Sequence, residues 1–548
     1  MSFELVRFYR REAPGPQNML LGSFIISGLS RGMLLAIVNA SVVKSVNGEP
    51  LLSSILLFFG VLVLYLSCHY FAKTKTYAMV GLMTQKLRLR LVNKLLFADL
   101  GFIENEGDNK IYARLTQEIN ILSQAGIILV GTFENAVLLV FSLIYIGWLS
   151  PVALLVTTCV VMAGMYAYVR QQRSAKNNIR RVREKEVEIF GAINDFLSGF
   201  KELKLNRKKN NAVNDHVEEV SDVYRDLTYK TERTFVKCFL TTETFIFALM
   251  AALVFVVPQF YDAESAVIFQ FLAALLFLIG PLDAVVSAVP RLIHANVALE
   301  NVRELESKAD KATAIDENLN RNVDALKLDR LELKALKFNY RGSQSDDAFG
   351  VGPVDFKLDC GEVVFIVGGN GSGKTTLVKL LTGLYLPSGG ELHINGAPLA
   401  IHDYQAYREM FSAIFGDFHL FKRLYGMEDI NRTVLAELLE KMHLDTKTHY
   451  DGEGFTAVNL STGQRKRLAY VTSYLEDKQI FIFDEFAADQ DPSFRQLFYR
   501  TLLPELKKQG KTVIAISHDD NYFDACDRIV KIDYGRIVYD GSPDGLLH

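Results

Sequence analysis

This chain of 548 residues has few cysteines, no excess of positive charge and no low-complexity tract. Its five cysteines are Cys68, Cys159, Cys238, Cys360 and Cys526. They lack metal-ligand and Cys-x-x-Cys spacing, so we expect buried free thiols rather than a zinc or redox site. The formal net charge of −3 offers no bulk basic character, which argues against nucleic acid as a partner.

The first part of the chain, to about residue 300, contains long apolar runs with almost no charged residues. A membrane-spanning helix needs roughly 20 mostly apolar residues. Six segments meet this requirement: about 18–43, 51–72, 125–148, 151–170, 237–258 and 265–290. The first follows three arginines, as in a signal peptide. Because it is long and lacks a small-residue cleavage site, we expect it to remain as a span.

The long segments 73–124 and 171–236 are charged, poor in proline and patterned like helices, so we expect them to extend the spans. Lysines and arginines gather where the spans meet these segments, whereas the short loops 44–50 and 258–265 together hold only Lys44. Positive residues favour the cytoplasmic side. We therefore expect a multi-pass protein of the bacterial inner membrane, with both termini and the second half of the chain in the cytoplasm.

A change of composition near residue 310 separates the apolar region from one of ordinary soluble character. Residues 298–310 have a charged helical pattern, and the polar segment 316–329 is expected to be loose. A strand-like run begins at Leu331. We predict a transmembrane domain with six helices over 1–300, a linker over 301–330 and an α/β domain over 331–548.

The second region contains a phosphate-binding loop, Gly368-Gly369-Asn370-Gly371-Ser372-Gly373-Lys374-Thr375. The loop follows an apolar strand, Val363–Val367, and precedes a helix expected to begin near Lys374, which is the context that a genuine phosphate loop requires. Glycines let backbone N–H groups wrap the phosphates of ATP, Lys374 adds positive charge, and the Thr375 hydroxyl suits Mg²⁺. A chance glycine-rich turn is the simpler alternative, but the flanking strand and helix argue against it.

Two further strands end in residues suited to hydrolysis. An apolar run over 480–483 is followed by Asp484, which should reach Mg²⁺ directly or through water, and by Glu485, which can polarise the attacking water. His518 follows a strand over 512–517 and could hydrogen-bond the γ-phosphate. Because an isolated histidine is more often structural, only the order of the motifs favours a catalytic role.

Another motif, Leu460-Ser461-Thr462-Gly463-Gln464, precedes a helix that we expect to start around Arg465, and a helix N-terminus favours anions. With the phosphate loop, the two carboxylates and the histidine, this motif resembles the signature of ABC transporters. The resemblance implies two cassettes that face head to tail, each ATP lying between the phosphate loop of one and the signature of the other. One cassette and six spans per chain then imply a half-transporter that forms a homodimer.

The resemblance covers nearly the whole chain. Residues 98–105 with 114–116 resemble the first intracellular coupling segment of exporters, and residues 199–204 resemble the second. By analogy Tyr340 would stack on adenine, although an ordinary strand tyrosine is the alternative. The residues expected at ATP are Tyr340, Gly368, Gly369, Asn370, Gly371, Ser372, Gly373, Lys374, Thr375, Thr376, Ser461, Thr462, Gly463 and Gln464. The expected Mg²⁺ ligands are Thr375 and Asp484, and the expected catalytic residues are Glu485 and His518.

Two segments resemble a narrower group. Residues 460–468 and 484–492 are similar to exporters of cyclic peptides, lasso peptides and peptide siderophores, of the pyoverdine and syringomycin exporter type. The chain departs from the general ABC pattern at Gly416, where most cassettes place a glutamine that joins Mg²⁺ to the membrane domain. The neighbouring Asp417 could take over part of that role. The segment after Glu485 is also unusual, but it keeps its final aspartate, Asp491.

Polar residues interrupt the apolar segments at Arg31, His69, Glu134, Glu243, Gln270 and Asp283. A carboxylate is costly at the bilayer centre, so such groups usually face a bundle interior or a cavity. We expect Glu243 to lie near the cytoplasmic end of its span. For Asp283, a substrate pathway and a helix end near water are equally good interpretations.

These observations predict a membrane all-α six-span exporter domain followed by an α/β P-loop ATPase cassette domain. The predicted function is ATP-driven export of a peptide-like metabolite, with ATP and Mg²⁺ as cofactors. The expected partners are a second copy of the chain, the cargo and membrane lipid. Two alternatives stay open: a lipid or multidrug exporter of the same architecture, and a regulatory ABC protein with little turnover. Gly416 favours the regulatory alternative, whereas Glu485 and His518 oppose it.

Overall fold

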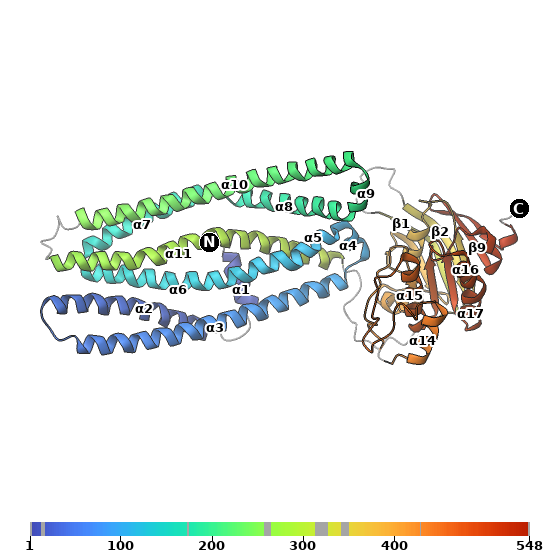
Figure 1. Cartoon of the computed structure of the whole chain (residues 1–548), viewed down its shortest axis with the longest axis horizontal. Helices are drawn as coiled ribbons and strands as arrows, with labels where there is room; N and C mark the ends of the chain where they lie inside the picture. Colours follow the sequence, from blue (N-terminus) through green and yellow to red (C-terminus); the bar gives the residue numbers. More distant parts are fainter. Residues whose placement is uncertain are drawn as a thin grey trace. The chain divides into compact units, whose positions relative to one another are not determined.

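The computed structural model describes residues 3–12, 17–172, 175–256, 265–312, 327–340, 350–427 and 429–545. The chain divides into two compact units, shown together in Figure 1. The helical unit comprises Met1–Leu96 and Ile103–Lys311, and the cassette unit comprises Phe97–Phe102 and Ala312–His548. Most of the predicted loop 258–265 and of the predicted linker segment 316–329 lies outside the described residues.

The helical unit consists of long helices joined by short connections. Its α-helices are α1 (Phe3–Glu12), α2 (Gln17–Val46), α3 (Leu52–Leu96), α4 (Leu100–Glu106, which begins in the cassette unit), α5 (Asp108–Ala113), α6 (Ile119–Leu149), α7 (Pro151–Gln172), α8 (Ala175–Ser198), α9 (Phe200–Leu205), α10 (Arg207–Ala251) and α11 (Ser265–Ala312). The described part of this unit also has two π-helical turns: η1 (Arg114–Glu118) leads into α6, and η2 (Ala252–Val256) follows α10. Among the described residues, six helices are long and apolar enough to cross a membrane, as the sequence predicts.

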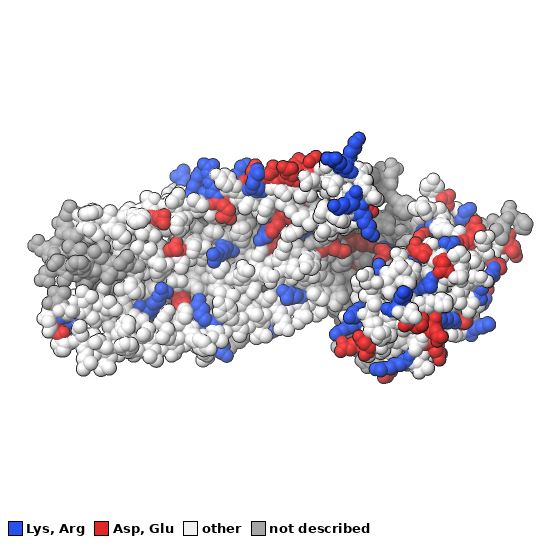
Figure 2. Space-filling view, in the orientation of Figure 1, with Lys and Arg blue, Asp and Glu red and all other residues white. Residues whose placement is uncertain are grey.

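Several of these helices are much longer than a membrane is thick. Helices α3 and α10 each have 45 residues, or about 68 Å at the usual rise, against a hydrocarbon core of about 30 Å. The prediction that charged helices extend the spans is correct for both. Figure 2 shows the broad uncharged surface of the helical unit and the mixed charges of the cassette unit.

Helices α2, α3 and α6 pack against one another, and α10 packs along α7 and α8 (Figure 1). An apolar cluster ties α6, α7, α10 and α11 together. Its buried members are Ile146, Ala153, Leu249, Leu253, Leu275 and Leu278. The Tyr168 hydroxyl of α7 also donates to the main-chain oxygen of Val286 in α11 at 3.3 Å.

The cassette unit has two sheets. The antiparallel sheet has the order β2-β1-β4-β5, and the larger sheet has the order β10-β9-β3-β8-β7-β6. Their strands are β1 (Arg330–Asn339), β2 (Gly350–Asp359), β3 (Val363–Val367), β4 (Gly389–Ile394), β5 (Ala397–Pro398), β6 (Phe411–Ile414), β7 (Ile480–Asp484), β8 (Thr512–Ile516), β9 (Arg528–Asp533) and β10 (Arg536–Gly541). The larger sheet is parallel except where β10 pairs with β9.

The helices of the cassette are short. They are α12 (Lys374–Leu381), α13 (Tyr404–Arg408), α14 (Arg432–Lys441), α15 (Thr462–Leu475), α16 (Pro492–Leu497) and α17 (Leu503–Lys508), with the short 3₁₀ helices η4 (Ile401–Asp403), η6 (Asp520–Ala525) and η7 (Pro543–Gly545) and the π-helical turn η5 (Phe498–Leu502). Side chains of the central strands alternate between two apolar cores. Phe481 and Phe483 of β7 join a core with residues of α14 to α17, whereas Ile480 and Ile482 join a core with β1, β2 and α12. Burial on both faces explains the uninterrupted apolar run of β7.

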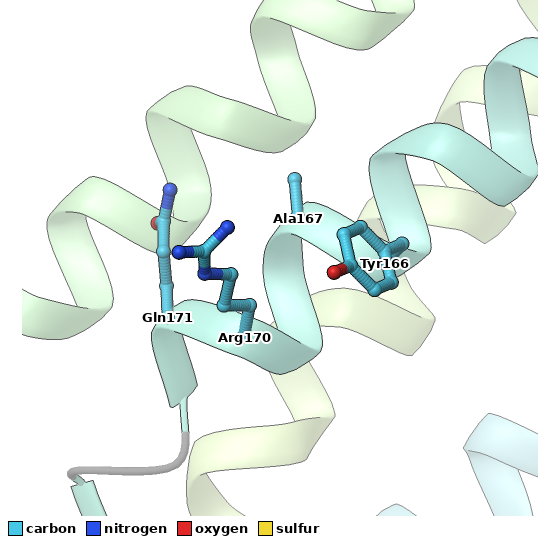
Figure 3. A pocket seen from close by; sticks show the side chains of 4 residues that line it. All are labelled: Tyr166, Ala167, Arg170 and Gln171. Carbon is cyan, nitrogen blue, oxygen red and sulfur yellow. The ribbon is translucent and has the colours of Figure 1, made fainter.

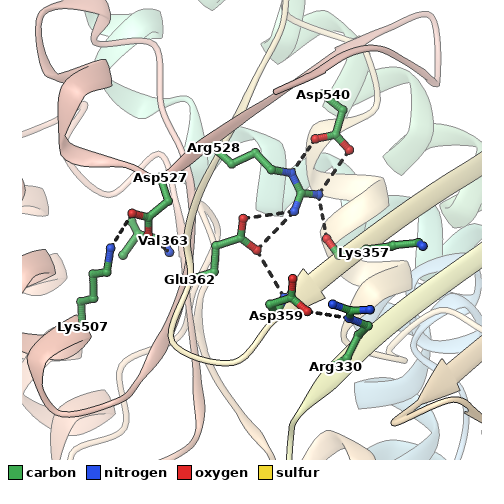
Figure 4. A network of polar contacts seen from close by, with 9 residues as sticks. All are labelled: Arg330, Lys357, Asp359, Glu362, Val363, Lys507, Asp527, Arg528 and Asp540. Carbon is green, nitrogen blue, oxygen red and sulfur yellow. Dashed lines mark hydrogen bonds and ion pairs between the residues drawn. The ribbon is translucent and has the colours of Figure 1, made fainter. Parts of the chain in front are cut away.

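A polar network at the edge of this core joins the two sheets (Figure 4). Arg528 of β9 bonds Glu362 and Asp540, and it donates to the main-chain oxygen of Lys357 in β2 at 2.7 Å. Arg330 of β1 pairs with Asp359 of β2. The network therefore fixes β9 against the antiparallel sheet.

Candidate functional site

The loop over 368–375 links β3 to α12, and its backbone requires glycine. Gly368 has φ +155°, and a Cβ there would lie 2.3 Å from the main-chain oxygen of Ile532. Gly373 has φ +104° and stands at the N-cap of α12 without a side-chain cap. The first N–H groups of α12 therefore have no side-chain partner from the N-cap residue and remain suited to an anion.

Polar side chains of this loop are buried and converge. Lys374 is 6% exposed. Its ammonium donates to the main-chain oxygens of Gly368 and Gly369, each at 3.0 Å. The buried Ser372 hydroxyl has no hydrogen-bond partner among the described residues. An unpartnered buried hydroxyl, an ammonium and an uncapped helix N-terminus together fit the phosphates of a nucleotide.

The carboxylate pair lies beside this loop because β3, β8 and β7 are parallel neighbours whose carboxyl ends meet at one edge. The Thr375 hydroxyl donates to Oδ2 of Asp484 at 3.0 Å. Burial raises the pKa of Asp484, while the bond from Thr375 and the main-chain N–H of Gly416 act in the opposite direction. A hydroxyl and a carboxylate in contact fit the ligand set that Mg²⁺ prefers.

Glu485 and His518 extend from the ends of two adjacent strands, β7 and β8, and meet. His518 Nε2 lies 3.3 Å from Oε1 of Glu485, and both side chains are almost half exposed. Glu485 has φ +50°, a left-handed conformation that is rare outside glycine. The structure therefore brings together Lys374, Thr375, Asp484, Glu485 and His518, which the sequence predicts as parts of one site.

Gly416 stands where most cassettes have a glutamine, so this position offers only main-chain atoms. The main-chain N–H of Gly416 lies near the Asp484 carboxylate and acts to lower its pKa, whereas Asp417 is exposed and has no hydrogen bond or ion pair among the described residues. A role for Asp417 in place of the glutamine stays a prediction.

The signature helix begins earlier than predicted. Helix α15 starts at Thr462, three residues before the expected start around Arg465. Ser461 is its N-cap, with its hydroxyl accepting from the Gln464 N–H, and the Gln464 side chain accepts from the Ser461 N–H in return. This capping box gives hydrogen-bond partners to two main-chain N–H groups, those of Ser461 and Gln464. It explains why the helix begins at Thr462. Thr462, Gly463 and Gln464 consequently form the first turn.

Within the described residues, no hydrogen bond or ion pair joins the signature to the phosphate loop. The signature is fixed instead to the segment that follows Glu485. Gln490 Nε2 donates to the Gly463 main-chain oxygen at 2.9 Å, and Arg467 donates to the side chains of Gln490 and Asp491 at 2.9 and 2.6 Å. These contacts fix the position of the signature within its own cassette.

Tyr340 follows β1 and is 42% exposed. Its hydroxyl lies 2.9 Å from Oγ1 of Thr376 in the first turn of α12, and its ring packs against Phe338 and Tyr385. The ring therefore stands next to the phosphate loop, and adenine stacking stays a prediction.

The first predicted coupling segment contributes to the cassette unit. Residues Phe97–Phe102 belong to that unit, and Leu100 packs against its apolar core. Burial lowers the pKa of Arg408 in α13, and the nearby carboxylate of Asp99 partly offsets this effect. The second predicted segment forms the short helix α9, in which Phe200 is 45% and Leu205 is 89% exposed.

Among the polar residues of the spans, Glu134 has partners that the sequence does not reveal. It is 4% exposed and joins three helices, because its Oε1 accepts from Ser27 of α2 at 2.8 Å and contacts His69 Nδ1 of α3 at 2.9 Å. Asp283 of α11 is exposed and has no hydrogen bond or ion pair among the described residues. Glu243 and Arg31 are half-buried, and the side chain of Gln270 lies outside the described part of the chain.

A pocket of about 550 Å³ lies at the end of α7 that is opposite Pro151. Tyr166, Ala167, Arg170 and Gln171 line it (Figure 3). Gln171 donates to Thr241 of α10 at 3.0 Å, so the polar wall of the pocket is held by the neighbouring helix.

Six membrane-crossing helices followed by this cassette define an ABC exporter half-transporter with ATPase activity. The family model for the ABC transporter transmembrane region matches residues 20–282, and the ABC transporter model matches residues 351–488. With 32% identity to a curated relative over nearly its full length, the chain belongs to the ABC transporter family.

The relatives include more than one type of exporter. ATP-binding protein SyrD of Pseudomonas syringae pv. syringae is 32% identical over 531 residues, which cover 94% of this chain and 92% of SyrD. The ATP-dependent lipid A-core flippase of Paraburkholderia xenovorans (strain LB400) is 24% identical over 476 residues, or 84% of this chain and 78% of the flippase. A bacterial Atm1-family ABC exporter with ATP bound shares the fold, with a TM-score of 0.77, 19% identity and coverage of 97% and 96%.

Proposed function

We propose that this chain is a homodimeric half-transporter that uses ATP to export a peptide-like metabolite across the bacterial inner membrane. The cargo class would be a cyclic or lasso peptide, a peptide siderophore or its precursor. The observation that carries this proposal is the similarity to SyrD, which extends over both the membrane region and the cassette. The resemblance of residues 460–468 and 484–492 to peptide exporters supports the same cargo class.

The residues of the cassette have separate roles in the proposed hydrolysis. Lys374, Ser372 and the N–H groups of α12 would bind and orient the phosphates. Glu485 would accept a proton from the attacking water, and His518, 3.3 Å away, would hold the Glu485 carboxylate and reach the γ-phosphate. When bound by Thr375 and Asp484, Mg²⁺ would neutralise phosphate charge.

The geometry of the signature supports the proposed dimer. Ser461 and Gln464 bond each other, and Gly463 accepts from Gln490. Among the described residues none of them has a hydrogen bond or ion pair with the phosphate loop, so a second cassette would complete each ATP site. The exposed apolar side chains of α9 support a further contact with a partner. Both termini and the cassette would be cytoplasmic, because positive residues gather at that end of the spans.

A lipid exporter is the second candidate. The similarity to lipid A-core flippases over 84% of the chain favours it, although the identity of 24% is lower than that to SyrD. A multidrug exporter has the same architecture. A regulatory protein with little turnover is opposed by the contact between Glu485 and His518, which preserves the arrangement that hydrolysis needs.

Asp283→Ala should lower cargo-stimulated ATP hydrolysis while basal hydrolysis stays intact. Asp283 is exposed on α11 in a stretch that is otherwise apolar, and a charged group there is favourable only beside water or a polar ligand. The measurement is ATPase activity of the full-length protein in lipid nanodiscs, with a cyclic lipopeptide, a peptide siderophore and lipid A-core added separately.

Stimulation by the peptides and not by lipid A-core would support the proposed cargo class, and the reverse order would favour the lipid exporter. Asp283→Asn is the matched control, because it keeps shape and hydrogen bonding without charge. Unchanged stimulation in Asp283→Ala would exclude a cargo role for Asp283. Loss of basal activity together with misfolding would show that Asp283 is a structural residue.

A further inference from the structure

Lys466 is a buried lysine of the signature helix that contacts the main chain of Glu485 in the same cassette. It lies in the second turn of α15, and its side chain is 4% exposed. Its ammonium donates to the main-chain oxygen of Glu485 at 2.7 Å and pairs with Oδ2 of Asp489 at 2.7 Å. Burying an ammonium is costly unless it is bonded, so these two contacts fix the position of the Lys466 side chain.

The main chain that Lys466 holds is in a strained conformation. Glu485 has φ +50°, and such a conformation persists in a non-glycine residue only where the surroundings hold it. The Glu485 N–H donates to the main-chain oxygen of Ile516 at 3.2 Å, and its carbonyl also accepts from the Ala488 N–H at 3.3 Å. Lys466 adds a shorter bond from a side chain on another element.

Other contacts make α15 and the segment after Glu485 a single assembly. Gln490 holds the first turn of α15 through Gly463, and Arg467 holds Gln490 and Asp491. Gly463 approaches so closely that a Cβ there would lie 3.0 Å from the Asp489 main-chain oxygen. A displacement of the signature helix is therefore transmitted to the main chain of Glu485.

We propose that Lys466 is a positioning residue for ATP hydrolysis. By holding the Glu485 carbonyl from the signature helix, it aligns the Glu485 carboxylate with the attacking water when the signature engages the ATP of the partner subunit. The inference rests on the proposed function, in which Glu485 is the general base and each signature completes the other cassette's site. Lys466 touches neither substrate nor the reacting atoms, and it acts through Glu485.

Lys466→Met should lower kcat for ATP by about 10- to 100-fold, because a small misplacement of a catalytic group costs that much. The KM for ATP should change by less than about twofold, since binding is retained. The full-length protein in nanodiscs should also retain radiolabelled ATP through rapid gel filtration as well as Glu485→Gln does. A protein with a damaged signature would fail to hold ATP between its cassettes, so ATP retention separates positioning from structural damage.

Lys511→Met is the matched control. Lys511 also donates to a carbonyl and a carboxylate, both of Asp477, which has φ +51° and follows the far end of α15. We expect the Lys511→Met protein to hydrolyse ATP normally. Asp489→Asn removes the ion pair but keeps the bond to the Glu485 carbonyl, so its kcat should fall less than that of Lys466→Met.

Normal kcat in Lys466→Met, or loss of ATP retention together with kcat, would overturn the proposal. An equal loss in Asp489→Asn would also overturn it, because the ion pair and not the carbonyl bond would then matter. If Lys466→Met does not accumulate as folded protein, Lys466→Gln is measured in the same way. Normal hydrolysis by Glu485→Gln would instead show that the proposed function has failed, and the role of Lys466 would fall with it.

Discussion

Glu485→Gln should lower the rate of ATP hydrolysis by about two orders of magnitude, the usual contribution of a general base, while ATP still binds. The amide keeps the size of the side chain but cannot accept a proton from water. Lys374 bonds main-chain oxygens of its own loop and Thr375 bonds Asp484, so the change at Glu485 leaves the contacts of these two residues in place. Phosphate release by the purified protein and the binding of radiolabelled ATP measure the two properties separately.

The control is Glu453→Gln, at an exposed glutamate of the same cassette that pairs with Arg423. It should hydrolyse ATP at the rate of the unmodified protein. Near-normal hydrolysis in Glu485→Gln would contradict the assignment of the general base, and loss of ATP binding would show that the substitution had damaged the phosphate loop.

Homodimers of Lys374→Ala and homodimers of Ser461→Arg should both lose ATP hydrolysis, whereas mixed dimers should recover one working site. Lys374→Ala removes the ammonium of the phosphate loop, and Ser461→Arg blocks the signature. In a mixed dimer the intact loop of one chain meets the intact signature of the other. The second site then carries both defects. ATPase activity of heterodimers purified through two different affinity tags is the measurement.

A control separates the signature from its capping role. Ser461 caps α15, and removing such a cap costs about 1 kcal/mol of stability. Ser461→Thr keeps the capping hydroxyl and should remain active. Normal hydrolysis by the Ser461→Arg homodimer would contradict the facing-cassette arrangement. Activity of mixed dimers equal to the mean of the two homodimers would contradict it as well.

The central strands of the cassette could be predicted because their sequence carries the signal. An uninterrupted apolar run such as Ile480 to Phe483 is typical of a parallel strand that is buried on both faces. Polar residues directly after such runs, Asp484 and His518, must lie at the same edge of the sheet. In the structure Asp484 accepts from Thr375 at 3.0 Å, and His518 lies 3.3 Å from the adjacent Glu485, as expected.

The start of α15 was predictable from a pattern that the sequence contains. Ser461 and Gln464 have the spacing of a capping box, which places the helix start at Thr462 and not at Arg465. In this case a local rule was sufficient, and it favoured the earlier start.

Contacts between distant helices were not predictable from periodicity. Ser27, His69 and Glu134 lie on α2, α3 and α6, and only the packing of the three helices brings them within hydrogen-bond distance. In the sequence, Lys466 likewise has the pattern of an ordinary charged residue on the exposed face of a helix. Its burial depends on the segment after Glu485 folding back over α15.

The most direct test of the proposed export is transport by the purified protein in vesicles with the cassette outside. With ATP and Mg²⁺ in the medium, a radiolabelled cyclic lipopeptide should accumulate inside the vesicles, and Glu485→Gln vesicles should accumulate none. Accumulation of lipid A-core without accumulation of the peptide would contradict a peptide-like cargo, and equal peptide uptake with and without ATP would contradict ATP-driven export.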